Sequence, residues 1–138
     1  MAFMTISGIE KVKKALKNEL YRIADRELGK AATKAMDVLG NAVSARTPVR
    51  TGELKAALVK HVHVDTRKGT VEADVGFSGK HAMIADAVEY GHNIVTHRPE
   101  LKTVGFASAH PFMRPAFDAS KEQAVEAFAA SIAESMGR

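Results

Sequence analysis

The sequence contains no cysteine and no tryptophan, and only two of its 138 residues are tyrosine. Without cysteine the chain has neither disulfide bonds nor a thiolate nucleophile, and this favours a protein made and assembled in a reducing cytoplasm. No apolar run approaches the roughly 20 residues that a membrane-spanning helix needs, and the first residues lack the pattern of a signal peptide. We therefore expect neither a disulfide framework nor a membrane partner.

The excess of basic over acidic residues is small and is unevenly distributed along the chain. The net charge is +4, made up of +4 in residues 1–47, +2 in residues 48–115 and −2 in residues 116–138. A basic N-terminal helix and an acidic C-terminal helix can attract each other within one protomer or between protomers of a ring. The same basic helix also allows an alternative function, a nucleic-acid-binding module, although acidic residues are interleaved and few aromatic rings can stack on bases.

The periodicity of apolar residues predicts an α+β fold in a single domain, 1–138. Residues 1–47 form a long helix region with a weak point at Gly29, and residues 48–114 form a small antiparallel sheet, a short helix and a long loop. Residues 58–65 and 70–77 alternate as a hairpin, and a short helix at 81–90 stops at Gly91. Residues 92–108 are expected to be an exposed loop, with a possible strand at 102–107.

The chain closes with a helix over residues 115–138, whose entry is restricted by two prolines. Pro111 and Pro115 bracket Phe112, Met113 and Arg114, and Pro115 suits a first helical turn. Phe112 and Met113 are expected in the core. The pattern also predicts an inward face for this helix, made of Val125, Phe128, Ala129, Ile132 and Met136.

No catalytic or cofactor site is expected. His61 and His63 share one strand face, but no helical His pair and no carboxylate at ligand spacing accompany them. There is no nucleophile elbow, and residues 76–80 only superficially resemble a phosphate-binding loop. Glu89 stands out because a carboxylate in the last turn of a helix opposes the helix dipole. It is expected to be either exposed or paired with Arg50 or Arg114.

Three motifs occur in order along the chain: TPVRTGELK at Thr47–Lys55, AVEYG at Ala87–Gly91 and HPFMRPA at His110–Ala116. Together they resemble the "aPv-TG-Lr", "vEfG" and "PFlrPA" motifs of the small head–tail joining (neck or tail-completion) proteins of long-tailed bacteriophages and prophages. The candidate fold and assembly residues at these motifs are Pro48, Thr51, Gly52, Leu54, Glu89, Tyr90, Gly91, Pro111, Phe112, Arg114 and Pro115.

The resemblance implies a structural virion protein of the phage neck and not an enzyme. It implies a ring of identical protomers, expected to be a hexamer, that joins the head-closing connector to the tail terminator and tail tube proteins. Phage DNA would pass through the lumen without its sequence being read. The protein would be made in the host cytoplasm and end in the virion, as a neck ring or a tail terminator. The chain departs from the pattern at His81, where the family has an aromatic residue, and in the long 92–109 link.

Overall fold

The computed structural model describes residues 9–97 and 99–137, with side chains from residue 14 onward. The expected α+β class is confirmed. The elements, in chain order, are α1 (Ile9–Arg46), α2 (Glu53–Ala56), β1 (Leu58–Asp65), β2 (Thr70–Phe77), α3 (Lys80–Tyr90), β3 (His92–Val95), β4 (Thr103–Ala107) and α4 (Met113–Met136).

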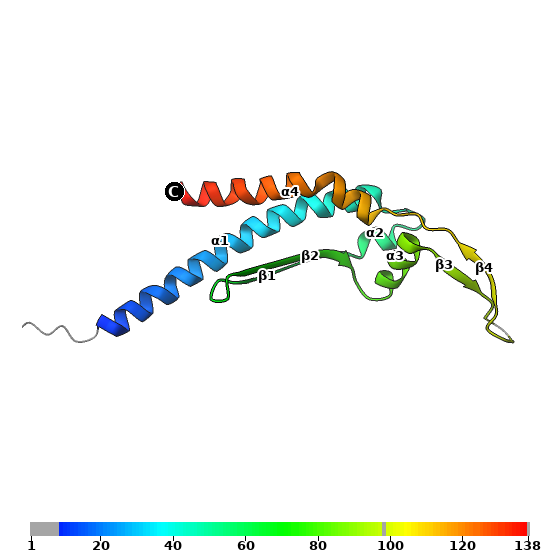
Figure 1. Ribbon diagram of the computed structural model, residues 1–138, viewed down its shortest axis with the longest axis horizontal. Coiled ribbons are helices and arrows are strands. Elements are labelled where there is room, and N and C mark those ends of the chain that lie inside the picture. The colour runs from blue at the N-terminus through cyan, green and yellow to red at the C-terminus, as the bar shows by residue number, and fades with distance from the viewer. Residues whose placement is uncertain (1–8, 98, 138) are drawn as a thin grey trace, which may run out of the picture.

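The molecule is elongated (Figure 1). Helices α1 and α4 run antiparallel beside each other and make the most extensive contact between elements, and the β1–β2 hairpin packs on α1. The short helices α2 and α3 lie near the C-terminal end of α1. The β3–β4 hairpin projects from this end, and at the other end the N-terminal part of α1 extends beyond the end of α4 (Figure 1).

Helix α1 is continuous over 38 residues, which gives a length of about 57 Å. Gly29 does not interrupt it. The sequence Ser7-Gly8-Ile9-Glu10 predicts a capping box at the start of this helix, and its first two residues lie outside the described residues. The buried face of α1 is formed mainly by small residues in its second half, whereas Leu16, Leu20 and Ile23 in the first half are exposed. The early apolar row therefore has no partner within the described protomer.

Both hairpins are antiparallel and two-stranded. The β1–β2 hairpin confirms the expectation, with Leu58 opposite Phe77 and Asp65 opposite Thr70. The prediction that residues 92–108 form a loop is wrong, because β3 and β4 pair there with an irregularity between Ile94 and Val95. The strand expected at 102–107 corresponds to β4, whereas β3 was not predicted. The four residues of β3 are too few to establish a period-two pattern, so their pairing with β4 had to come from the folded chain.

The expected inward face of α4 is largely wrong. Val125 is 67% exposed and Met136 is 82% exposed, and Ala129 is exposed as well. The buried residues are Ala116, Ser120, Ala124 and Ser131. Small side chains on α4 let it approach α1, so the larger apolar residues of α4 lie beside the contact line. The hydroxyl of Ser120 is satisfied within the helix, where it donates to the Ala116 carbonyl at 2.6 Å.

The core consists of two small clusters. One joins Val43, Phe77, Ala85 and Phe112 with neighbouring residues of α1, α2, β2, α3 and α4. The other joins Ala35, Met36 and Leu39 of α1 to Ala124 of α4. Among the residues with described side chains, seven of the twelve buried apolar residues are alanine. The protomer therefore buries few large side chains of its own.

Candidate functional site

Glu89, at the end of α3, caps the N-terminus of α4. Its carboxylate oxygen Oε2 accepts hydrogen bonds from the backbone N–H groups of Phe112 at 2.8 Å and Met113 at 2.9 Å. Its Oε1 accepts from the N–H of Arg114 at 3.0 Å. The next residue, Pro115, has no N–H to satisfy. The first four residues of a helix normally have backbone N–H groups without a partner in the helix. Here the Glu89 carboxylate accepts from three of them, and the fourth residue is a proline without an N–H.

This capping explains why a carboxylate occupies an unfavourable position in α3. Glu89 is only 6% exposed, and burial alone would raise its pKa. The three backbone hydrogen bonds, with a smaller contribution from the positive charge of Arg114, outweigh burial and hold the pKa of Glu89 below its ordinary value. The negative charge opposes the dipole of α3 but lies at the positive end of α4, where it is favourable.

Gly91 lets the β3–β4 hairpin pass close to the end of α3. Its φ is +79°, a conformation that side chains disfavour, and a Cβ there would lie 2.7 Å from both the Ala107 carbonyl oxygen and Phe106 Cζ. The backbone N–H of His110 also donates to the Val88 carbonyl at 2.8 Å. The second motif therefore holds both the hairpin and the entry to α4.

The first motif packs against the opposite side of α3. Thr47 ends α1 with its hydroxyl donating to the Val43 carbonyl at 2.7 Å, and Gly52 precedes α2 with φ at +84°. Leu54 packs on the core cluster that contains Phe112. His81, where the resembled family has an aromatic residue, lines the same hollow as Thr51 and Leu54. Its ring is half-buried.

One core cluster therefore brings the three motifs together. Leu54, Val88 and Phe112 each contribute to it, and the Phe112 ring meets that of Phe77 edge-on with centroids 5.8 Å apart. The Thr51 hydroxyl is exposed and only accepts a local bond from the Glu53 N–H at 3.4 Å. The other candidate residues are exposed and outside the cluster: Pro48, Tyr90, Pro111, Arg114 and Pro115.

The expected ion pair of Glu89 is replaced by backbone hydrogen bonds. Within the described residues, the guanidinium groups of Arg50 and Arg114 form no ion pair with it, and Arg114 contacts it through the backbone N–H. The expectation identified the correct segment but the wrong atoms. A carboxylate at the wrong end of one helix, followed by a proline in the first turn of another, is the sequence signal that could have predicted this cap.

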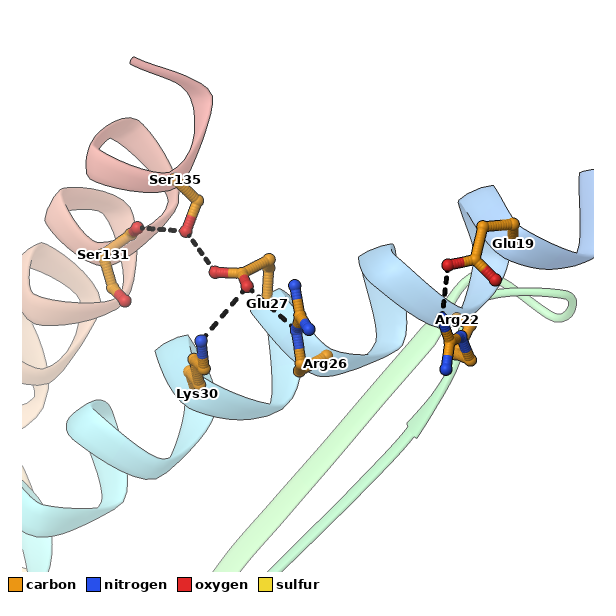
Figure 2. Close-up of polar contacts among 7 residues, drawn as sticks. All are labelled: Glu19, Arg22, Arg26, Glu27, Lys30, Ser131 and Ser135. Carbon is orange, nitrogen blue, oxygen red and sulfur yellow. Dashed lines mark hydrogen bonds and ion pairs between the residues drawn. The ribbon is translucent and has the colours of Figure 1, made fainter. Parts of the chain in front are cut away.

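A second polar cluster joins the middle of α1 to the C-terminal end of α4 (Figure 2). Ser135 Oγ donates to Glu27 Oε2 at 2.7 Å, and Lys30 Nζ lies 3.2 Å from Glu27 Oε1. These two hydrogen bonds, the first being the larger effect, lower the pKa of Glu27 to about 2. Lys34 and Glu134 add an ion pair between the helices at 3.6 Å. The attraction expected between a basic and an acidic helix thus operates within the protomer.

Large apolar side chains are exposed on the projecting segments. On the β3–β4 hairpin, Leu101 is 76%, Val104 63% and Phe106 62% exposed. On the projecting part of α1, Leu16 is 60% and Leu20 67% exposed. Several large exposed apolar side chains on one projecting segment are typical of an interaction surface.

Within residues 9–97 and 99–137, no three His, Cys, Asp or Glu side chains lie close enough together to hold a metal ion. His61 and His63 are exposed on β1. In the same described ranges, no helix combines the length and apolarity needed to cross a membrane.

No protein-family model matches the sequence, and searches of curated proteins and of solved structures give no significant match.

Proposed function

We propose that this protein is a structural component of the phage neck, a ring of identical protomers that joins the DNA-filled head to the tail. The observation that carries the proposal is the exposed apolar surface on segments projecting from both ends of the protomer. A protein that acts alone in solution has no use for such surface, whereas a ring subunit needs it for its neighbours and axial partners.

The composition of the core supports assembly as the source of stability. Among the residues with described side chains, sixteen large apolar residues are exposed, while most buried apolar residues are alanine. Each two-stranded sheet also has open edges, which a neighbouring chain can cover. Apolar surface that one protomer leaves exposed can be buried against neighbouring protomers.

The Glu89 cap gives the three motifs a physical role in this function. The cap fixes α4 against α3, and Gly91 with the His110 N–H fixes the β3–β4 hairpin there, so that surfaces on separate elements keep one relative geometry. A ring closes only if each protomer presents its two contact surfaces at a constant angle. The motifs therefore act as positioning elements, and the proposed role requires no catalytic residue, cofactor or metal.

The alternative, nucleic-acid binding through α1, has weaker support. Arg22, Arg26 and Lys30 are paired with carboxylates of the same helix, and Lys34 is paired with Glu134 of α4. Paired cations release fewer counterions on binding DNA. A steep salt dependence of DNA binding by the purified protein would favour this alternative.

Loss of the gene from its phage tests the proposal. We expect full heads and separate tails, visible by electron microscopy, with joining restored by the purified protein. The variant Phe106→Ser should restore joining poorly, and Met83→Ser, which changes a still more exposed residue of α3, should restore it fully. Normal joined particles without the protein would contradict the proposal.

A further inference from the structure

An apolar groove runs along α1 between β2 and α4. Two adjoining hollows of about 450 and 360 Å³ form it. Both are lined by Met36 and Leu39 of α1, by Ala73 of β2 and by Phe117 of α4. The β2 edge beside the groove has no strand partner in the described chain, since its sheet contains only β1 and β2. The groove is thus open along its length.

The rim of this groove is acidic. Asp74 and Asp86 line one hollow, and Glu122 and Glu126 line the adjoining surface next to Val125. All four carboxylates are on exposed residues, and none forms an ion pair within the described part of the chain. Arg114 and Lys121 only partly offset this charge. An occupant that fits the groove should therefore be apolar on one face and basic beside it.

The projecting part of α1 has this chemistry. Leu16, Leu20 and Ile23 follow at spacings of four and three residues, so they form one stripe along the helix. Residues 9–26 contain six basic and three acidic residues. Lys14 and Lys17 are exposed beside the stripe. The stripe lies on the N-terminal side of Glu27, the residue of α1 that Ser135 contacts near the end of α4.

We propose that the apolar stripe of α1 (Leu16, Leu20 and Ile23) docks into the β2–α4 groove of a second copy of this chain. A protomer cannot fill its own groove in this way, because the floor of the groove is the continuation of the same continuous helix. The β3–β4 hairpin is a poorer match in charge, since its Lys102 is already paired with Glu100 at 2.9 Å. The contact is head-to-tail, so its repetition generates a ring or a filament.

This inference rests on the proposed function and names the surface by which the ring closes. Sedimentation velocity of the full chain tests it. Leu20→Ser should weaken self-association roughly 10- to 100-fold, because the interface loses the burial of one leucine side chain. Met83→Ser should not weaken it. Combined Lys14→Glu and Lys17→Glu should weaken it about tenfold at low salt, and adding Glu122→Lys and Glu126→Lys to that chain should restore it.

Cross-linking then identifies the contact directly, since the chain has no cysteine of its own. A mixture of Leu20→Cys and Val125→Cys proteins should form cross-linked dimers, and neither protein should do so alone. Cross-links between two Leu20→Cys chains would overturn the inference. It would also be overturned if Val125→Cys formed cross-links with Phe106→Cys and not with Leu20→Cys. Self-association of Leu20→Ser as tight as that of the wild type would also overturn it but leave the neck proposal standing. A wild-type protein that remains monomeric and joins no heads to tails would overturn both.

Discussion

Replacing Glu89 tests the most specific interaction in the structure. Glu89→Ala leaves three helix-end N–H groups without their acceptor in a site that is only 6% exposed. Loss of an N-cap costs about 0.5–2 kcal/mol, and a hydrogen bond to a charged group contributes about 1.5–3 kcal/mol, but the three bonds share one carboxylate and are not additive. We therefore expect a loss of about 2–4 kcal/mol in the free energy of unfolding.

Urea unfolding followed by circular dichroism measures this loss, which corresponds to a fall of roughly 8–16 °C in Tm for a chain of this size. Asp86→Ala is the matched control. It removes an exposed carboxylate one turn earlier on α3 that makes no hydrogen bond to α4 within the described residues, so its effect should stay within about 0.5 kcal/mol. Equal stability of the two variants would refute the capping argument.

The pH dependence gives a second test with a definite sign. The pKa of Glu89 is lowered in the folded protein, so its carboxylate stabilises the fold above the unfolded value of 4.5. This contribution is lost as the pH falls through the folded pKa. The stability difference between wild type and Glu89→Gln should therefore be largest near neutral pH and shrink on acidification below 4.5. A difference that does not change with pH would mean that the charge contributes nothing.

Three further predictions concern other parts of the fold. Gly91→Ala should destabilise the protein by about 3 kcal/mol in urea unfolding, because of the positive φ and the close approach of β4, whereas Gly29→Ala, with open space around its Cβ, should stabilise it by up to about 1 kcal/mol. The carboxyl group of Glu27 should titrate near pH 2 by NMR, and Ser135→Ala should move that pKa upward towards 4.5. Replacing residues 96–102 with a two-residue turn should leave the Tm of the protomer within a few degrees but reduce head–tail joining, and unaltered joining would exclude the hairpin tip from the interface.

Local patterns in the sequence were sufficient to predict most of the helices and strands, but not all of them. The long helix, the β1–β2 hairpin and the short helix before Gly91 each have a periodicity or a turn that can be recognised within one segment. The β3–β4 hairpin has no such local pattern, because β3 has only four residues and its register with β4 is irregular. A short strand becomes recognisable only when its partner is known.

The buried face of α4 could not be predicted for a different reason. Hydrophobicity favours Val125 and Met136 as inward residues, but the contact with α1 selects small residues such as Ala116 and Ser120. Periodicity ranks residues by their preference for burial and contains no information on how closely two helices approach. The same limit applies to the Glu27–Ser135 hydrogen bond, whose partners lie 108 positions apart in the sequence.

These misassigned apolar residues have a common physical explanation in assembly. A sequence pattern reports all the burial that a chain undergoes, including burial against other copies. Val125 on α4 was expected inside the protomer and is instead exposed, as are Leu16 and Leu20, which belong to the apolar periodicity of α1. All three lie in the two surfaces that we infer to meet between copies. If they are buried in the ring, the periodicity predicted their burial correctly and erred only in assigning it to one chain. Hydrogen exchange of α1 in the free and the assembled protein would distinguish the two cases, since burial in the ring should slow exchange around Leu16 and Leu20 only after assembly.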